Sequence, residues 1–168
     1  MKSSDIKKTA ISGLLIALDV LFTRVLAINT PVMKIGLGFL AVAVCGALYG
    51  PVWAAVCGAL GDLLGSLIFP TGAYFPGFTL TAAVTGLIFG LFLKKYSGWK
   101  AAAAAALNVV LVSFLANTAM ITFISGAEYR KLLETRAVQI AVMLPVQAVG
   151  LAVVLPLILK RIKKDKEN

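Results

Sequence analysis

Apolar residues fill six long stretches of this chain, and short polar, proline-rich or glycine-rich segments separate them. A helix needs about 20 mostly apolar residues to cross a bilayer. The pattern therefore predicts an all-α membrane protein, in which residues 1–168 form a single domain built as a bundle of six transmembrane helices. The predicted helices cover 6–28, 34–49, 51–69, 78–93, 99–124 and 136–159.

The composition agrees with this pattern. The 168 residues are 60% hydrophobic and 14% charged, whereas soluble domains average about 45–50% apolar and about 25% charged residues. Lys2, Lys7 and Lys8 precede a first apolar stretch that is too long for the core of a signal peptide, so we expect this helix to be retained. Cys45 and Cys57 lie in apolar stretches, and we expect them to be buried packing residues.

The basic residues are unequally divided between the two ends of the predicted bundle. One end holds most of the 16 lysines and arginines. This group consists of Lys2, Lys7, Lys8, Lys94, Lys95, Lys100, Lys160, Arg161, Lys163, Lys164 and Lys166. Because cytoplasmic segments are enriched in Lys and Arg, we expect both termini in the cytoplasm. Topology and anionic lipid then explain the net charge of +9, and we expect no nucleic acid partner.

Small residues and one acid share a face of the third predicted helix. Gly58, Gly61, Asp62 and Gly65 follow helical spacing, and small residues allow membrane helices to pack closely. Asp62 would lie near the middle of the bilayer, where a carboxylate is costly. It is either a structural group held by backbone, hydroxyl or basic partners, or a group that binds a ligand or an ion, and both interpretations remain open.

Further polar side chains lie mostly in the outer halves of their predicted helices. Arg24 either reaches the outer headgroups or holds a ligand carboxylate. The fifth predicted helix contains Ser113, Asn117 and Thr118. The sixth carries a stripe at helical spacing, formed by Arg136, Gln139, Met143, Gln147 and Gly150. Amides often join helices in membrane bundles, but the convergence of these groups also favours a ligand pocket.

The connection between the third and fourth predicted helices is rich in proline, glycine and aromatic residues. Tyr74, Phe75 and Phe78 lie close together there, and the charge distribution puts this connection on the outer side. Aromatic residues at a membrane interface commonly form a belt. The alternative is a lid whose rings stack on a flat heterocycle.

Signatures of catalysis are missing from the sequence. It contains no histidine, which removes the usual general base and the commonest metal ligand, and it contains no glycine-rich phosphate loop. We therefore predict a binding protein rather than an enzyme, with no cofactor and no metal.

The segment that begins at Gly61 gives a more specific signal. It resembles the substrate-binding S components of energy-coupling factor (ECF) vitamin transporters, and most closely their folate-type members. Two runs carry this resemblance, Gly61-Asp62-Leu63-Leu64-Gly65 and Phe69-Pro70-Thr71-Gly72-Ala73-Tyr74-Phe75-Pro76-Gly77-Phe78-Thr79. The chain length, the six predicted helices and the outer loop between the third and fourth helices also match this family.

The resemblance implies a high-affinity binding subunit in the prokaryotic plasma membrane that captures folate outside and delivers it inward. Its implied partners are a transmembrane T component and two ATPase subunits, which hydrolyse ATP. The family contacts the T component through a small-xxx-small motif on the first helix, and Gly13 and Ala17 are the nearest match here. The expected substrate-binding residues are Arg24, Asp62, Tyr74, Phe75, Phe78, Thr79, Asn117, Arg136, Gln139 and Gln147.

For a folate ligand, we expect Asp62 to accept adjacent N–H donors of the pterin. Arg24 or Arg136 would neutralise the glutamate carboxylates. The remaining expected roles are amide hydrogen bonds from Asn117 and Gln147, and ring contacts from Tyr74, Phe75 and Phe78.

Three alternatives stay open. Within the same family, the ligand could be another vitamin, such as riboflavin, thiamine or its precursor, or pantothenate. A self-sufficient channel or carrier would be expected to have an internal repeat and a polar path across the whole membrane, and neither is evident in the sequence. A structural membrane subunit would bind no vitamin at all.

Overall fold

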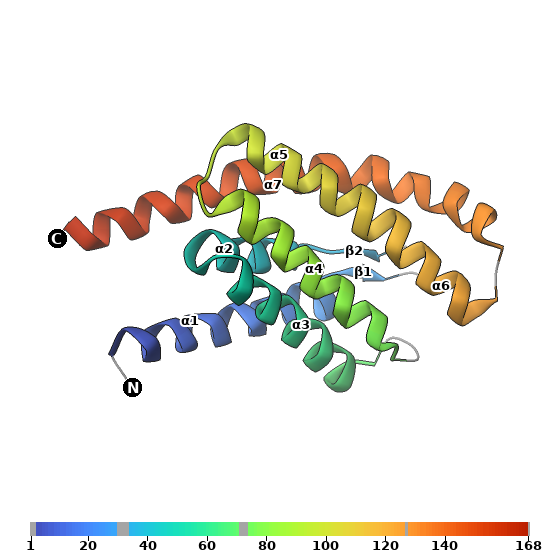
Figure 1. The fold of residues 1–168 in the computed structure, drawn as a ribbon, viewed down its shortest axis with the longest axis horizontal. Coiled ribbons are helices and arrows are strands. Elements are labelled where there is room, and N and C mark those ends of the chain that lie inside the picture. Colours follow the sequence, from blue (N-terminus) through green and yellow to red (C-terminus); the bar gives the residue numbers. More distant parts are fainter. Residues whose placement is uncertain (1–2, 30–33, 71–73, 127, 168) are drawn as a thin grey trace.

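The computed structural model describes residues 3–29, 34–70, 74–126 and 128–167. Within these residues the chain forms six helical rods (Figure 1). Their α-helices are α1 (Ser3–Val20), α2 (Phe39–Tyr49), α3 (Pro51–Ile68), α4 (Pro76–Leu93), α5 (Gly98–Leu107), α6 (Asn117–Ser125) and α7 (Tyr129–Glu167). Two π-helical stretches complete the rods: η1 (Leu21–Val25) extends α1, and η2 (Asn108–Ala116) joins α5 to α6. The predicted helical bundle is therefore confirmed.

Four of these rods are long and apolar enough to cross a membrane. They are Pro51–Ile68, Pro76–Leu93, Gly98–Ser125 and Tyr129–Ile162. The helix α2 is apolar but has only 11 residues. The first rod carries Asp5, Lys7, Lys8 and Asp19 within α1, so it is less apolar than the others. The chain is thus a multi-pass membrane protein in which the two N-terminal rods differ from the rest.

The first two helices have different boundaries from those predicted. The first rod ends at Val25 rather than at residue 28, and α2 begins at Phe39 rather than at Lys34. Between them, β1 (Ile28–Asn29) and β2 (Lys34–Ile35) pair as antiparallel strands. The apolar content of these residues suggested that they are helical. In the structure, the backbone N–H and C=O groups of this connection find partners in the strand pair instead of in a helix. Thr30 and Pro31, expected to end the first helix, lie outside the described residues.

The last helix is longer than predicted at both ends. It begins at Tyr129 instead of residue 136 and ends at Glu167 instead of residue 159. Polar residues mark where a helix leaves the bilayer, but they do not stop it, because Arg, Lys and Glu are good helix formers. The helix also continues through Pro145 and Pro156. The predicted polar connection of 125–135 is therefore mostly the first turns of α7.

Glycines bring α3 and α4 into close contact. A Cβ atom on Gly86 would collide with the backbone carbonyl of Ala54, and one on Gly58 would lie 2.5 Å from the carbonyl oxygen of Ala82. Small residues at helix interfaces allow such an approach in lipid. The packing role predicted for Gly58 is confirmed, and this tight pair forms one wall of the interior.

The first and last helices and the α3–α4 connection lie toward different ends of the bundle. The helix α1 begins and α7 ends on the same side of the molecule, at the left of Figure 1, whereas α3 ends and α4 begins toward the opposite side. On α5, the alanine-rich face packs inside the bundle, where Ala101, Ala104 and Ala105 join a buried cluster with Leu151 and Leu155 of α7. The start of α1 and the end of α7 therefore lie toward one end of the bundle in this view, and the side of the membrane that they face stays a prediction.

Candidate functional site

A cavity of about 430 Å³ lies among the helices. Its walls come from α1 and η1, the start of α2, α3, α4, η2, α6 and α7. Every residue in the predicted substrate-binding set except Thr79 lines it. These lining residues are Arg24, Asp62, Tyr74, Phe75, Phe78, Asn117, Arg136, Gln139 and Gln147. The volume falls within the range of about 300–1,000 Å³ that is usual for small-molecule sites.

Asp62 on α3 lies at the centre of the first polar group. Its Oδ1 forms an ion pair with Arg24 at 3.2 Å, with side-chain exposures of 19% for Asp62 and 8% for Arg24. The hydroxyl of Thr79 donates to Asp62 Oδ2 at 2.9 Å, and the hydroxyls of Thr79 and Tyr74 are 3.0 Å apart. Asp62 is therefore held by a basic and a hydroxyl partner, yet it still faces the cavity.

Arg24 points inward because of the π-helical turn that carries it. Gly13 and Ala17 on α1 are exposed to the outside of the bundle, and in a straight helix Arg24 would continue their stripe. The i→i+5 hydrogen bonding of η1 makes the turn wider and shifts the face on which later residues lie. Arg24 consequently contacts Asp62 and packs against Gly65. Of its two predicted positions, the one facing the cavity is observed.

Asp19 is a cavity residue that the sequence reasoning left out of the candidate set. Asp19 is only 5% exposed and lines the cavity. Its carboxylate occupies the space that a Cβ atom would need at Gly38, before α2, and at Gly61 on α3. The available signal was its depth in an apolar helix, because an ionisable residue within the membrane usually serves a function.

The second polar group contains Arg136 of α7, which is 5% exposed. Its Nε donates to Gln139 Oε1 at 3.2 Å, and its Nη1 donates to the Thr118 hydroxyl at 3.1 Å. Arg24 by contrast has the carboxylate of Asp62 beside it, and Lys131 has that of Glu128. Arg136 is thus a buried cation that neutral oxygen atoms solvate, with no carboxylate partner among the described residues.

Side-chain amides and hydroxyls extend this second group along η2 and α4. Asn108 Nδ2 donates to Gln147 Oε1 at 3.0 Å, and the Thr85 hydroxyl donates to Asn108 Oδ1 at 2.7 Å. The Thr81 hydroxyl donates to Asn117 Oδ1 at 2.8 Å. Sequence analysis missed Asn108, Thr81 and Thr85, which lie within apolar runs without a visible polar stripe.

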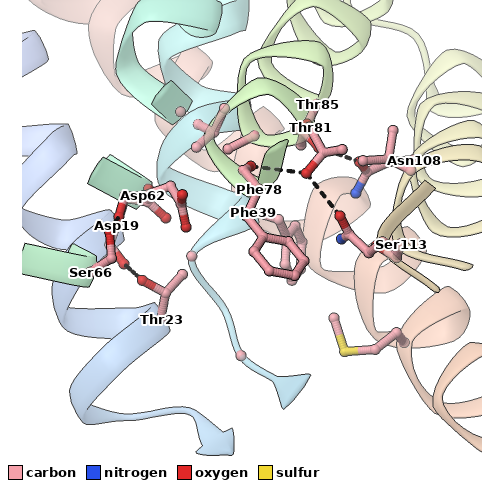
Figure 2. Close-up of a pocket in the computed structure, with 18 of the residues that line it drawn as sticks. Asp19, Thr23, Phe39, Asp62, Ser66, Phe78, Thr81, Thr85, Asn108 and Ser113 are labelled. Atoms are coloured by element: carbon pink, nitrogen blue, oxygen red, sulfur yellow. Dashed lines mark hydrogen bonds between the residues drawn. The ribbon is translucent and has the colours of Figure 1, made fainter. Parts of the chain in front are cut away.

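Aromatic rings lie between and beside the polar groups. In the view of Figure 2, Asp19, Thr23, Asp62 and Ser66 are on one side of the Phe39 ring, and Thr81, Thr85, Asn108 and Ser113 are on the other. Phe75 and Phe78 make an edge contact with ring centroids 6.1 Å apart, and Phe75 also approaches Phe123 of α6 at 6.2 Å. Tyr74, Phe75 and Phe78 line the cavity, as a lid would. Thr71, Gly72 and Ala73 of the same run lie outside the described residues.

The cavity is electrically polarised. Among its described lining residues, the end formed by α1, η1 and α3 holds Asp19, Arg24 and Asp62, which have a formal charge of −1 together. The end near α6 and α7 holds Arg136, with a formal charge of +1. In a low-dielectric interior such charges act strongly on a guest. The arrangement suits a ligand with hydrogen-bond donors at one end, a flat ring system and an anion at the other end.

Comparison with known families identifies the architecture. Residues 3–164 match the family described as ECF-type riboflavin transporter, S component. The chain belongs to the S-component family of ECF transporters. An S component is the substrate-binding subunit of a membrane transporter, so the prediction that the chain is not an enzyme is confirmed, as is the resemblance seen in the sequence.

Curated relatives of this S component are folate transporters. It is 43% identical to the folate transporter FolT of Clostridium novyi (strain NT) over 137 residues, which cover 80% of each chain. It is 29% identical to the folate transporter FolT of Leuconostoc mesenteroides subsp. mesenteroides over 117 residues, which cover 68% of this chain and 63% of the relative.

A solved structure has the same fold. The S component superimposes on a crystal structure of FolT bound with folic acid with a TM-score of 0.82 at 30% sequence identity. The match covers 88% of this chain and 93% of the solved one. The bundle described above is therefore a known arrangement for a membrane protein that encloses a small molecule.

Proposed function

We propose that this S component captures folate from outside the cell and delivers it inward as part of an ECF importer. The observation that carries the proposal is the polarised cavity, with an acceptor-rich end at Asp62 and a buried cation at Arg136. Folate has a matching layout, since its pterin carries N–H donors and its glutamate carries carboxylates. The folate transporters among the relatives support the same ligand.

Arg136 is our candidate for the glutamate carboxylate. Arg24 already has Asp62 as a counterion, whereas Arg136 is held by Gln139 and Thr118. A planar guanidinium can bind a carboxylate with two parallel hydrogen bonds. A ligand carboxylate would therefore neutralise the buried charge of Arg136 without displacing an internal ion pair.

The pterin would then bind at the opposite end. Asp62 keeps acceptor capacity beyond its contacts with Arg24 and Thr79, because a carboxylate offers about four lone-pair positions. Asn117 hydrogen-bonds with Thr81, and Gln147 hydrogen-bonds with Asn108. Figure 2 shows Thr81 and Asn108 on the other side of Phe39 from Asp62. We therefore assign these two amides to the linker and tail of the ligand rather than to its pterin.

The aromatic rings would cover the middle of the ligand. Phe78 lines the cavity between the two polar groups, and Tyr74 and Phe75 precede α4 at one side of it. Flat ring systems gain from offset or edge contacts with aromatic side chains. Thr79 would act indirectly, since its hydroxyl joins Asp62 to Tyr74.

Delivery of the ligand would depend on the outer face of α1. Gly13 has nothing within 4 Å of the position of a Cβ atom, and both Gly13 and Ala17 are exposed. These small residues therefore serve no packing role inside the bundle and are available to the T component, which acts with two ATPase subunits. We further propose that both termini face the cytoplasm of a prokaryotic cell, as the distribution of basic residues indicates.

Identification of the co-purified ligand tests the proposal. We expect mass spectrometry of the purified chain to find a folate, and a thermal-shift panel of vitamins to give the largest stabilisation with folate. Riboflavin is the second candidate, because the matching family is described by that vitamin. It carries no carboxylate for Arg136, so its selective stabilisation of the protein would contradict the folate proposal.

A further inference from the structure

We propose that Thr85 and Asn108 are positioning residues for the folate site, because they turn the side-chain amide of Gln147 so that its NH2 group faces the cavity. A chain of hydrogen bonds does this. It runs from a hydroxyl on α4 through an amide at the start of η2 to an amide on α7. The proposal rests on the proposed function, in which Gln147 binds oxygen atoms in the linker and tail of folate.

The distances give this chain its direction. The Thr85 hydroxyl carries one hydrogen, and its oxygen lies 2.7 Å from Asn108 Oδ1 and 3.0 Å from the Thr81 carbonyl oxygen. The contact with Asn108 is the shorter one, so this hydroxyl donates to Oδ1. Asn108 then points Nδ2 toward Gln147 Oε1, at 3.0 Å. The oxygen end of the Gln147 amide is therefore used inside the bundle.

The NH2 end of Gln147 is left for a ligand. Gln147 and Asn108 are each 3% exposed, and both line the cavity. An amide NH2 group carries two donors, and no described residue accepts a hydrogen bond from Gln147 Nε2. Because a buried donor without a partner costs free energy, a guest that brings an acceptor atom to this position is favoured. The carbonyl and carboxylate oxygens of folate are such acceptors.

The π-helical stretch η2 places a second amide beside α4. Asn108 begins η2, and Asn117 follows its last residue, nine positions later. In an α-helix, with roughly 3.6 residues per turn, residues nine apart would lie on opposite faces, whereas the wider turns of a π-helix bring them to the same face. Asn108 meets Thr85, and Asn117 Oδ1 lies 2.8 Å from the Thr81 hydroxyl, one turn earlier on α4. Both amides consequently line the cavity.

Thr85→Val tests the positioning role, because valine keeps the shape of threonine and removes its hydroxyl. We expect the dissociation constant for folate to rise about three- to tenfold, since the loss of one neutral hydrogen bond has an effect of this size. Thr85→Ser restores the hydroxyl and should bind folate nearly as tightly as the wild type does.

Thr9→Val is the matched control. The Thr9 hydroxyl bonds to the carbonyl oxygen four residues earlier on an exposed part of α1, as the Thr85 hydroxyl can on α4, but it lies outside the cavity. Its removal should leave the folate affinity unchanged. Wild-type affinity in Thr85→Val would overturn the proposal.

A double-mutant cycle shows whether Thr85 acts through Gln147. Gln147→Met removes the amide and keeps the length of the side chain, so it should weaken folate binding by itself. In that background, Thr85→Val should cause no further loss of affinity. Equal losses with and without the amide would overturn the proposal, because Thr85 would then contact the ligand itself or support the bundle independently of Gln147.

A measurement on the wild type tests the direction of the chain and needs no Thr85 variant to fold. The side-chain NH2 resonances of Gln147 can be identified in the NMR spectrum of isotope-labelled protein by their absence in Gln147→Met. We expect one of these protons to shift downfield when folate binds, because it becomes a donor to a ligand oxygen. If folate binds and neither proton shifts, the NH2 group does not donate to the ligand, and the proposal is overturned.

The proposed function fails in a recognisably different way. If the wild type binds no folate, the folate function is wrong, and the positioning role is overturned with it. If the wild type binds folate but the cycle gives independent losses, the folate function stands and only the role of Thr85 and Asn108 is wrong.

Discussion

The carboxylate of Asp62 lies inside the bundle beside the guanidinium of Arg24. From the sequence, a carboxylate at this depth in the membrane indicated either a structural or a ligand-binding role, and both were left open. The structure combines the two, since Asp62 is paired with Arg24 and also lines the cavity. Helical spacing alone could not predict this pairing, because it depends on the π-helical turn of η1 and on the contact between α1 and α3.

Breaking this buried pair should reduce both stability and affinity. In Asp62→Asn, Arg24 would lose the carboxylate that lies 3.2 Å from its Nη2, and breaking a buried ion pair typically costs about 3–5 kcal/mol. We expect a lower melting temperature and at least a tenfold loss of folate affinity, and Arg24→Gln should act similarly. The two can be measured by thermal unfolding in detergent and by isothermal titration calorimetry.

A surface pair provides the control for this experiment. Lys131 and Glu128 are 3.1 Å apart with side chains 81% and 60% exposed, and exposed pairs contribute about 0–1 kcal/mol. Lys131→Gln should therefore leave the melting temperature and the affinity almost unchanged. Wild-type affinity in both Asp62→Asn and Arg24→Gln would mean that these residues do not contribute to the ligand site.

Individual helices were predicted well where apolar length decides their structure, and less well where polar residues alter it. The rods that begin at Pro51, Pro76 and Gly98 start within a few residues of the predicted positions. The β1–β2 pair, the extra turns of α7 and the stretches η1 and η2 were not predicted. Both π-helical stretches carry cavity residues, Arg24 on η1 and Asn108 on η2, in agreement with the frequent occurrence of π-turns at functional sites.

The α3–α4 interface should tolerate no added side chain. A Cβ atom at Gly86 would collide with the Ala54 carbonyl, and overpacking of this kind typically costs about 1–3 kcal/mol. We expect Gly86→Ala to lower the melting temperature of the purified protein. Gly98→Ala is the matched control, because nothing lies within 4 Å of its Cβ position. Equal melting temperatures for the two variants would contradict the close packing of α3 on α4.

The outer face of α1 should separate binding from transport. Gly13→Leu and Ala17→Leu add bulk to an exposed surface that faces away from the cavity, so we expect normal folate affinity in the purified chain. In cells that also contain the T component and both ATPases, folate uptake should be lost. Loss of binding in these variants would show instead that the two residues support the bundle.

At the scale of the whole molecule, the number of helical rods and the convergence of polar groups on one interior region could be predicted from the sequence. The volume of the cavity and its polarity could not be predicted, because both arise from how η1, α3 and α7 face one another. Asp19 was missed for the same reason. Its importance depends on Gly38 and Gly61, which lie far from it in the sequence and next to it in the fold.

The orientation in the membrane can be tested with introduced cysteines. Cys45 and Cys57 are fully buried, so a membrane-impermeant thiol reagent should not label the wild type. Gly98 lies at the start of α5, near the basic segment between α4 and α5, and Ser125 ends α6; both are exposed. In intact cells we expect labelling of Ser125→Cys but not of Gly98→Cys. The reverse pattern would place the termini outside.

Equilibrium binding of folate to the purified chain in lipid nanodiscs is the sharpest test of the proposed folate site. We expect saturable binding of one folate per chain that an excess of riboflavin, thiamine or pantothenate does not displace, because these vitamins lack a donor-rich head combined with a carboxylate tail that spans the two charged ends. Failure of folate to bind, or its displacement by riboflavin at comparable concentration, would show that the cavity is not a folate site.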